Sequence, residues 1–470
     1  MRVRNPRTGA HDYEILPLDP AGVEAACATL RARQQAWAAL RFSNRAAILE
    51  RFAAAIEAHA DALTNALATD TGRLAISRIE VASVAGMIRR WAANAEAIVA
   101  RAYPAEQSTT IPGITARTRL VPYPLVGVIS PWNFPLTLSL IDAVPALAAG
   151  CAVIVKPSEV TPRFIRPLVD CIPPELPLAV IEGDGATGAA LVPNVDYVAF
   201  TGSVATGRKV ALAAAEAMIP ASLELGGKDP MVVLASADPV HAAAVALRAS
   251  IVNSGQACQS IERVYVARAI AEPFLAALTQ QAEAVRLNAN DIATGDIGPF
   301  IFEKQAAIVQ AQLDDAVARG ATVLAGGQVE TIGGGVYLRP TVLTGVTPDM
   351  ALMREETFGP VIPVTVFDGE DEAVALANAG EFGLSAAVMA GTVEEAERVG
   401  ERLQAGGVSI NDGSLTAFVW EAEKSSFGSS GLGPSRMGDS GLLRFFRRQA
   451  LIRQSGRALP IAAYAEDATR

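Results

Sequence analysis

The feature that most constrains this chain is an alternation of short apolar runs with helical stretches, which begins at residue 127. Buried strands of a parallel sheet appear as unbroken apolar runs, and each needs a crossover before the next strand. The pattern therefore predicts βαβ units, an α/β fold with a parallel sheet, and ligands at the carboxyl ends of the strands. The runs are Gly127–Ser130, Ala152–Lys156, Leu178–Ile181 and Tyr197–Phe200.

The rest of the chain extends this α/β pattern on both sides. Residues 20–101 are rich in alanine, carry apolar residues at helical spacing, and are interrupted at Gly72. Polar and apolar residues alternate in Thr115–Val121, which predicts an exposed strand, as in a hairpin arm. Beyond residue 230, helices are predicted at 240–251, 269–286 and 304–319, with strands at Met231–Leu234, Val264–Val266, Val364–Phe367 and Gly407–Asn411.

Length and composition exclude several classes of protein. A chain of 470 residues is expected to form two or three domains. The net charge of −10 argues against a nucleic-acid partner, which needs clustered Lys and Arg. The longest apolar stretch, Leu136–Val155, contains Asp142 and Pro145, so we expect no membrane span. The N-terminus lacks the apolar core of a signal peptide, and four scattered cysteines predict neither a disulfide framework nor a metal site, so a cytoplasmic location is expected.

One cysteine stands in a setting that suits chemistry rather than packing. Cys258 follows Asn253-Ser254-Gly255-Gln256-Ala257, a small, polar segment that we expect to be flexible and to leave the thiol accessible. Upstream, Glu224 lies between two leucines and precedes two glycines. A thiol and a carboxylate form a nucleophile and base pair if the fold brings them together. The alternative is a buried structural thiol and an unrelated surface acid. The three histidines lie outside any motif.

Two glycine patterns compete as a phosphate-binding turn. Gly183–Gly188 fits G-x-G-x-x-G after a predicted strand, but the acidic residue expected about 20 positions later is not clearly present. Gly202–Lys209 nearly fits a P-loop, with Arg208 where the lysine belongs. The residues favour the second pattern, because Ser203 and Thr206 offer hydroxyls and free amides at a helix start. Either segment could also be a plain strand-to-helix turn.

Taken together, the motifs resemble the aldehyde dehydrogenase superfamily over residues from about 20 to about 455. Six blocks follow in the family's order, and such an ordered set is far more specific than any one block. They are Pro131–Pro135 (PWNFP), Lys156–Glu159 (KPSE), Phe200–Ser203 (FTGS), Leu223–Lys228 (LELGGK), Gly255–Cys258 (GQAC) with Arg263, and Glu356–Pro360 (ETFGP).

The resemblance implies a catalytic role for three residues. Cys258 would add to an aldehyde to give a thiohemiacetal and, after hydride loss, a thioester. Glu224 would be the general base that activates water for hydrolysis of that thioester. The side-chain amide of Asn133 and the Cys258 backbone N–H would form the oxyanion hole, because donors are needed where negative charge develops.

The resemblance also implies a dinucleotide cofactor and no metal. Lys156 and Glu159 would hold the adenosine ribose, and a carboxylate there favours NAD over NADP; NADP remains an alternative, held by Lys156 and Ser158. Ser203 and Thr206 would hold the pyrophosphate, which leaves Gly183–Gly188 without a phosphate. Glu356 would hold the nicotinamide ribose, with Phe358 beside the ring. The full expected contact set is Ile129, Trp132, Lys156, Ser158, Glu159, Gly202, Ser203, Thr206, Gly207, Leu225, Glu356 and Phe358.

The implied architecture has three parts. Residues 1–103 and 122–227 would form a Rossmann-like dinucleotide-binding domain, and 228–425 a catalytic domain that carries the nucleophile. Residues 104–121 and 442–470 would form a β-hairpin oligomerisation arm and a C-terminal segment, with a homodimer or homotetramer as the assembly. Two segments depart from the family pattern: 423–428, which in the family borders the substrate entrance, and 457–470, which runs past the expected last strand.

Two other activities stay open at this stage. A CoA-acylating aldehyde dehydrogenase would pass the thioester to CoA, although Glu224 argues for water instead. A cofactor-free cysteine thioesterase or amidase would use Cys258 and Glu224 alone, but would have no use for the dinucleotide set. The small-molecule aldehyde itself is not indicated by the sequence.

Overall fold

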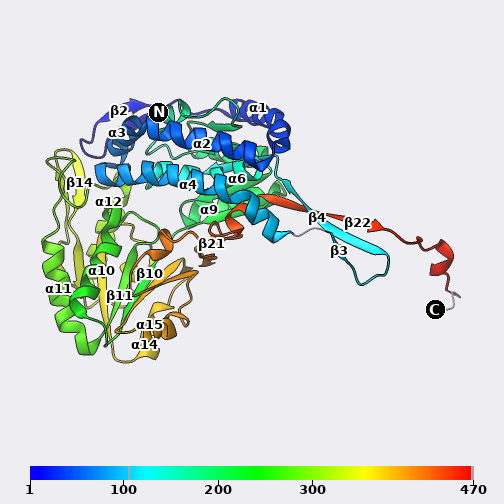
Figure 1. The fold of residues 1–470 in the computed structure, drawn as a ribbon. Coiled ribbons are helices and arrows are strands. Elements are labelled where there is room, and N and C mark those ends of the chain that lie inside the picture. Colours follow the sequence, from blue (N-terminus) through cyan, green and yellow to red (C-terminus); the bar gives the residue numbers. More distant parts are fainter. Residues whose placement is uncertain (104–105, 467–470) are drawn as a thin grey trace.

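The computed structural model describes residues 1–103 and 106–466, and its two large sheets have helices on both faces (Figure 1). The predicted α/β fold with parallel sheets is therefore confirmed. The predicted helical region 20–101 forms four helices that pack on both faces of the first sheet: the first helix on one face, and the next three on the other. Its break at Gly72 is the left-handed residue (φ 68°) that ends the third helix. The elements are β1 (Arg2–Arg4), β2 (His11–Glu14), α1 (Pro20–Ala39), α2 (Phe42–Ala58), α3 (Ala60–Thr71) and α4 (Leu74–Ala102).

The first sheet has six strands in the order β21-β9-β8-β5-β6-β7, all parallel except β21. Alternate residues of β5 enter different cores: Val126 and Val128 pack under α2 and α4, whereas Leu125 and Ile129 pack against α1 and α9. The strands are β5 (Leu125–Ile129), β6 (Ala152–Lys156), β7 (Leu178–Val180), β8 (Tyr197–Thr201), β9 (Ala221–Glu224) and β21 (Gly431–Leu432). The helices are α5 (Pro135–Leu140), α6 (Ala143–Ala149), α7 (Ile165–Val169), α8 (Gly185–Leu191) and α9 (Val204–Glu216).

The order of these strands creates a switch point between β5 and β8. From β5 the chain moves outward through β6 to β7, then returns to β8 on the other side of β5 and continues to β9. Crossover loops diverge at such a point and leave a crevice at the carboxyl edge of the sheet, where ligands of open α/β sheets bind. The segments that leave this edge begin at Ser130, Lys156, Gly202 and Leu225.

The second sheet has seven strands in the order β12-β15-β16-β11-β10-β18-β19, antiparallel only at β12. Its two faces carry separate apolar cores, one beneath α12, α14 and α15 and one beneath α10 and α11. The strands are β10 (Asp229–Val233), β11 (Ile261–Ala267), β12 (Thr322–Ala325), β15 (Thr341–Thr344), β16 (Val361–Phe367), β18 (Ser385–Met389) and β19 (Gly407–Ile410). The helices are α10 (Pro239–Ile251), α11 (Ala271–Glu283), α12 (Glu303–Ala318), α13 (Ala351–Arg354), α14 (Glu370–Ala377) and α15 (Val393–Gly400).

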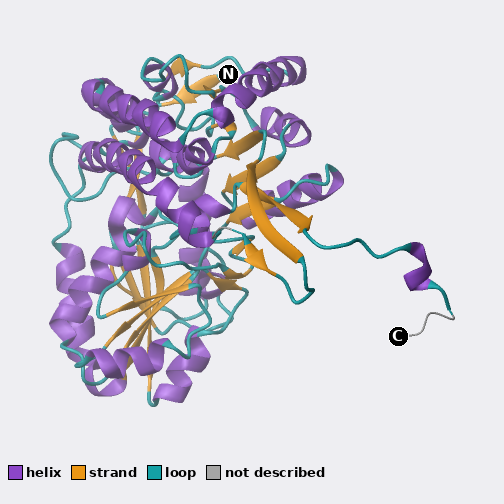
Figure 2. Cartoon of the chain, turned by 45° about the vertical axis from the view of Figure 1, so that its right-hand side comes forward, coloured by secondary structure: helices purple, strands orange, loops and turns teal. Residues whose placement is uncertain are grey.

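A three-stranded arm projects from the body (Figures 1 and 2). It pairs β22 (Phe446–Gln454) with β4 (Ile114–Pro122) over nine residues, and β3 (Gln107–Ser108) adds a short edge. The predicted strand at 115–121 thus has an antiparallel partner from the far end of the chain, preceded by α16 (Ser440–Leu443). Beyond it lies a 3₁₀ turn, η5 (Ile461–Tyr464). Residues 104–105 and 467–470 of the expected arm and C-terminal segment lie outside the described residues.

The expected domain limits stay a prediction. The limit at 227/228 falls between β9 and β10, which lie in different sheets, whereas β21 returns to the first sheet from beyond residue 425. Two short pairs, β13 (Val329–Ile332) with β14 (Gly335–Leu338) and β17 (Phe382–Gly383) with β20 (Phe427–Gly428), complete the strands. No helix in 1–103 or 106–466 is long and apolar enough to cross a membrane.

Candidate active site

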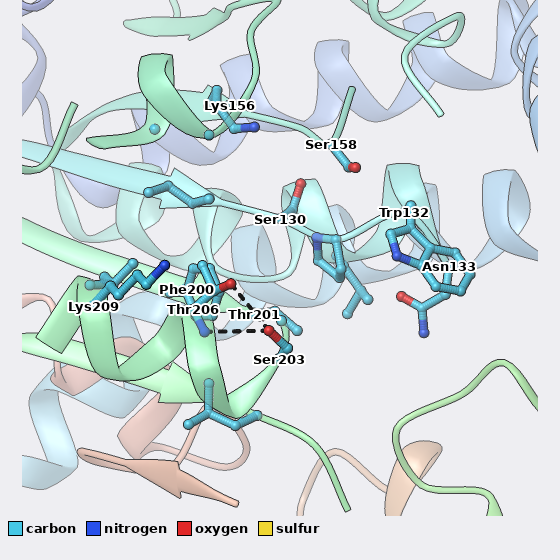
Figure 3. Close-up of a pocket in the computed structure, with 18 of the residues that line it drawn as sticks. Ser130, Trp132, Asn133, Lys156, Ser158, Phe200, Thr201, Ser203, Thr206 and Lys209 are labelled. Atoms are coloured by element: carbon cyan, nitrogen blue, oxygen red, sulfur yellow. Dashed lines mark hydrogen bonds between the residues drawn. The ribbon is translucent and has the colours of Figure 1, made fainter. Parts of the chain in front are cut away.

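A cavity of about 670 Å³ opens at the switch point of the first sheet (Figure 3). Its walls come from the loops that leave β5, β6, β8 and β9, and from Cys258, Glu356 and Phe358 of the second sheet's region. Eleven of the twelve residues expected to contact a dinucleotide line this cavity: Ile129, Trp132, Lys156, Ser158, Glu159, Gly202, Ser203, Thr206, Leu225, Glu356 and Phe358.

The helix start at Ser203 forms the part of the cavity suited to an anion. Ser203 is the N-cap of α9, and its Oγ accepts from the Thr206 backbone N at 3.4 Å and donates to the Thr206 Oγ1 at 3.1 Å. The first amides of a 13-residue helix and its dipole favour negative charge here. Gly207 does not line the cavity. It faces Leu225 so closely that a β-carbon would overlap the leucine side chain.

The competing glycine segment also reaches the cavity, but its helix start already has a partner. The Asp184 carboxylate caps α8, accepting from Ala186 N at 2.9 Å and Thr187 N at 3.2 Å. Gly185 and Gly188 also line the cavity. They shape the site, but the Ala186 and Thr187 amides at this helix start are already taken by Asp184. The rule that ligands lie at strand ends could have identified them, since they follow β7.

Lys156 and Glu159 lie together at this end of the cavity. The Lys156 Nζ is 3.5 Å from a Glu159 carboxylate oxygen and donates to the Gly183 carbonyl at 3.2 Å. Burial lowers the pKa of Lys156, and Glu159 opposes that shift. Lys209, on the exposed side of α9, lines the same cavity and was not anticipated, because nothing in the sequence distinguishes it from an ordinary surface lysine.

At the other end, Glu356 and Phe358 are held by a buried ion pair. Both carboxylate oxygens of Glu262 accept backbone amides, from Thr357 and Phe358, each at 2.8 Å. The Lys228 Nζ binds the same carboxylate at 2.7 Å. Phe358 adopts a left-handed conformation (φ 54°), which an L side chain adopts only when its surroundings enforce it. The pair therefore fixes the loop that faces the cavity.

The resulting positions suit a nicotinamide ribose and ring. Glu356 accepts from the Gly227 backbone N at 3.1 Å, and burial raises the pKa of Glu356 to about 8. The Phe358 ring meets Trp132 edge-on, with centroids 5.3 Å apart. A carboxylate and an aromatic face side by side match the hydroxyls and the flat ring of such a group.

The loop before Cys258 is buried and rigidly bonded, so the expectation of a flexible segment is wrong. Asn253, Ser254 and Gly255 all have left-handed backbones, with φ of 53°, 59° and 71°. Gly255 passes so close to the Gly359 carbonyl that no β-carbon would fit. The Gln256 side chain bonds to the backbone on both sides, including Ile301 N at 2.8 Å. The loop thus presents Cys258 from a fixed base.

Asn133 lies beside this loop, and it lines the cavity together with Cys258. Its side-chain N–H donates to the Gln256 carbonyl at 3.1 Å, while the Asn253 side chain donates to the Asn133 carbonyl at 3.0 Å. An amide nitrogen carries two hydrogens, so one remains for an oxygen placed at Cys258. The pair of bonds orients that donor across the junction of the two sheets.

Cys258 is partly exposed to the cavity, whereas Cys27, Cys151 and Cys171 are buried. Burial raises the pKa of the Cys258 thiol to about 12, and the negative charge of Glu224 adds to the rise; Lys424 and Arg436 oppose it. The thiol is therefore the resting form. Attack on a carbonyl requires a proton acceptor, and none of the three histidines lines the cavity.

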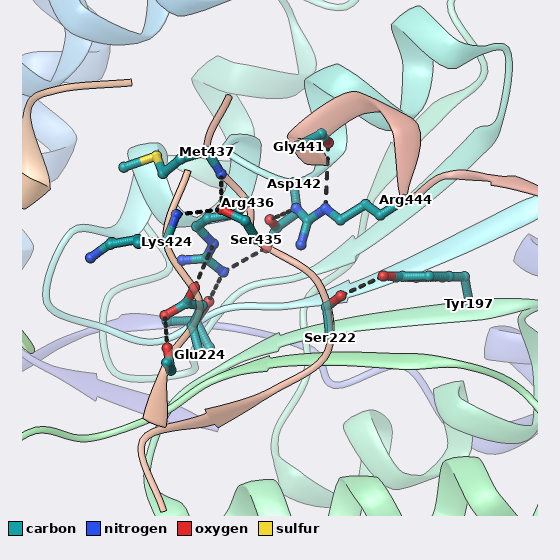
Figure 4. Close-up of polar contacts among 12 residues, drawn as sticks. Asp142, Tyr197, Ser222, Glu224, Lys424, Ser435, Arg436, Met437, Gly441 and Arg444 are labelled. Atoms are coloured by element: carbon teal, nitrogen blue, oxygen red, sulfur yellow. Dashed lines mark hydrogen bonds and ion pairs between the residues drawn. The ribbon is translucent and has the colours of Figure 1, made fainter. Parts of the chain in front are cut away.

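Glu224 ends β9 and does not line the large cavity, although its charge acts on Cys258. One carboxylate oxygen accepts from the Ser426 Oγ at 3.2 Å, and the other lies 4.0 Å from the Arg436 Nε (Figure 4). Ser426 lies in the segment 423–428 that departs from the family pattern, and Arg436 follows that segment; no sequence signal indicated either neighbour. Within the described residues, no cluster of His, Cys, Asp and Glu could hold a metal ion.

Comparisons with known proteins agree with this geometry. Residues 1–451 match the Aldehyde dehydrogenase family. The chain is 40% identical over 439 residues to a putative succinate-semialdehyde dehydrogenase [NADP(+)] of Mycolicibacterium smegmatis, covering 91% of this chain and 84% of that protein. It is 38% identical over 423 residues to a betaine aldehyde dehydrogenase of Cereibacter sphaeroides, covering 87% and 85%.

Solved structures show the same similarity. A putative aldehyde dehydrogenase, PutA, from Anabaena variabilis is 49% identical and superposes with a TM-score of 0.95 over 98% of both chains. A betaine aldehyde dehydrogenase from Staphylococcus aureus, solved in complex with NAD+, is 28% identical with a TM-score of 0.90 over 98% of this chain and 95% of that one.

Proposed function

The chain belongs to the aldehyde dehydrogenase family and is an NAD(P)-dependent aldehyde dehydrogenase; from this premise we propose how its residues carry out the oxidation. The observation that carries the proposal is one cavity that joins Cys258 and Asn133 to an anion-binding helix start and to Glu356. A nucleophile, an oxyanion donor and a dinucleotide-sized cleft in one place are what the reaction requires.

In the proposed first step, the Cys258 sulfur attacks the aldehyde carbon as its proton leaves. Because the pKa of the thiol is about 12, the proton must pass to an acceptor during attack, and we assign that role to Glu224, directly or through water. The negative oxygen that forms is stabilised by the Asn133 side-chain amide and the Cys258 backbone N–H. Neither donor has to reorganise, because the nucleophile loop and Asn133 are bonded to each other.

The dinucleotide would be held by Ser203 and Thr206 at its pyrophosphate, by Lys156 and Glu159 at its adenosine ribose, and by Glu356 at its nicotinamide ribose. When bound, the oxidised nicotinamide supplies the hydride acceptor that converts the thiohemiacetal on Cys258 into a thioester. Glu224 first releases the thiol proton to solvent and so returns to the carboxylate. It then takes a proton from water as the water oxygen adds to the thioester carbon; the C–S bond breaks, Glu224 passes this proton to the sulfur, and the thiol and the carboxylic acid result.

The cofactor choice between NAD and NADP rests on Glu159. Its carboxylate accepts from ribose hydroxyls and repels a 2′-phosphate, so we propose that NAD is preferred. The Mycolicibacterium relative is named for NADP(+), and the Staphylococcus structure holds NAD+, so the relatives support either cofactor. We also propose a cytoplasmic location, which suits four unpaired cysteines, and a homodimer or homotetramer formed through the arm of β4 and β22.

For the aldehyde, we propose a substrate that carries a carboxylate. The Lys424 ammonium is buried, has no hydrogen-bond partner among the described residues, and lies near enough to Cys258 to oppose the rise in its pKa. Its charge also acts on the buried Asp229, but an ammonium with no hydrogen-bond partner would gain one from an anionic substrate group. This chemistry agrees with the semialdehyde named for one relative and disfavours the cationic aldehyde named for the other.

The test is turnover followed at the nicotinamide absorbance, with NAD and NADP, for succinate semialdehyde, betaine aldehyde and a neutral aldehyde of similar length. Cys258→Ala should abolish NADH formation, whereas Cys171→Ser, at a buried cysteine outside the cavity, should retain it. Full activity of Cys258→Ala would overturn the assignment of the nucleophile. A preference for betaine aldehyde would overturn the proposed substrate class, and acceleration by CoA would indicate acyl transfer instead of hydrolysis.

A further inference from the structure

A buried cluster of charges lies directly behind Glu224 (Figure 4). Asp142, just before α6, is 1% exposed and binds two arginines of the C-terminal segment. The Arg436 Nη2 lies 2.9 Å from one carboxylate oxygen and also donates to the Thr201 Oγ1 at 2.7 Å; Arg444 binds the other oxygen. These contacts leave Arg436 little freedom to move.

The cluster carries one positive charge too many unless Glu224 is included. Two guanidiniums face a single carboxylate, and all three side chains are at least nine-tenths buried. Uncompensated charge is costly away from water, so a second carboxylate is expected nearby. Glu224 is that group, since its Oε1 lies 4.0 Å from the Arg436 Nε. The Nε itself has no hydrogen-bond partner among the described residues.

The remaining surroundings of Glu224 leave Arg436 as its nearest cation. Its strand neighbours are Thr201 of β8 and Gly431 of β21, neither of which is charged. Lys424 and Arg444 line a small cavity with Glu224, but neither forms an ion pair with it. Cys258 is the other titratable group whose state depends on Glu224.

We propose that Arg436 is the positioning residue of Glu224, which aims the carboxylate at the thioester. The inference rests on the proposed role of Glu224 as the base for hydrolysis. Arginine does not lose its proton in proteins, so Arg436 supplies fixed charge and one N–H donor and does not relay a proton. A carboxylate shift of about an ångström would complete that hydrogen bond. Asp142 acts one step further back, because it anchors the guanidinium.

The experiment separates acyl-enzyme formation from hydrolysis by rapid-mixing NADH kinetics. Arg436→Gln should slow the NADH burst less than the steady state, because the thiol proton can still reach Glu224 through water, and its steady-state rate should fall at least 10-fold below wild type. The ratio of the burst rate constant to the steady-state rate should therefore rise. Arg436→Lys, which keeps the charge, should restore the steady-state rate to within threefold of wild type.

The matched control is Arg444→Gln, which removes a guanidinium from the same Asp142 without touching Glu224. We expect less than a threefold change in its steady-state rate. A wild-type steady-state rate in Arg436→Gln would overturn the proposal, and so would an equal loss of rate in Arg444→Gln. If Arg436→Gln does not fold, Arg436→Lys decides: a steady-state rate within threefold of wild type supports the proposal, and a larger loss overturns it. Wild-type hydrolysis by Glu224→Gln would instead refute the assignment of the base.

Discussion

The protonation state of Cys258 gives the sharpest prediction. Burial, reinforced by Glu224, raises the pKa of the thiol to about 12. At pH 8 about one molecule in 10⁴ would then carry a thiolate, whereas an ordinary cysteine with a pKa of about 8.5 is roughly one-quarter ionised. A thiolate becomes more nucleophilic as its pKa rises, with a Brønsted coefficient of about 0.4–0.5, so the Cys258 thiolate should be roughly 40-fold more reactive than an ordinary cysteine thiolate. Attack on a disulfide should therefore be about 50-fold slower than that of a free cysteine.

The assay is the second-order rate of reaction with a small aromatic disulfide in the cofactor-free enzyme, from pH 6 to pH 10. The rate should rise about tenfold per pH unit without a plateau, and Cys258→Ala gives the background from the three buried cysteines. Glu224→Gln should react faster at each pH, because the negative charge of Glu224 raises the pKa of the thiol. A plateau below pH 9 would refute the reasoning. A slower Glu224→Gln would show that the carboxylate already accepts the thiol proton in the free enzyme.

Two further predictions test the loops around the cavity. Gly255→Ala should lower turnover by more than about 100-fold, because the left-handed backbone at Gly255 and the nearby Gly359 carbonyl leave no room for a methyl group. A variant with a wild-type circular dichroism spectrum, a wild-type melting profile and normal turnover would contradict this prediction. The second prediction concerns Glu356, whose pKa burial raises to about 8. In the unfolded chain the pKa is near 4.5, so the free energy of unfolding should fall as pH rises from 4.5 toward 8. Glu356→Gln removes this ionisation, so the melting temperature of the cofactor-free variant, relative to that of the wild type, should rise with pH across that range. Parallel plots of melting temperature against pH for the two proteins would count against the buried carboxyl.

The parts of the fold that could be predicted are those in which the local sequence pattern alone indicates the element. Strands β5, β6 and β8 are buried on both faces, so their sequences are unbroken apolar runs and were identified within one or two residues. Strand β9 was missed, because Ala221–Glu224 is short and ends in a carboxylate that only its neighbours make compatible with a sheet. The arm and C-terminal segment were expected within 104–121 and 442–470, but no residue signal showed that the strand paired with β4 would begin as early as Phe446.

The candidate site divides in the same way. Its strand-end loops could be located, because parallel strands place their carboxyl ends along one edge. The rigidity of the Cys258 loop could not, because polar residues such as Ser254 and Gln256 suggest solvent until their partners at Gly298 and Ile301 are known. Arg436 was hidden for a related reason: a buried arginine has the same local sequence as an exposed one, and only Asp142 distinguishes them.

These partners matter because the reacting groups come from opposite sides of a junction. Asn133 and Glu224 leave the first sheet, whereas Cys258 and Glu356 belong to the region of the second. The hydrogen bonds that cross the junction run from Asn133 to Gln256, from Asn253 to Asn133 and from Gly227 to Glu356. Each uses a backbone group on one side, so the spacing is set by the main chain and not by flexible side chains. Glu224 has no such bond to Cys258, which is why its alignment must come from elsewhere, and the buried charge of Arg436 is the contact that can supply it.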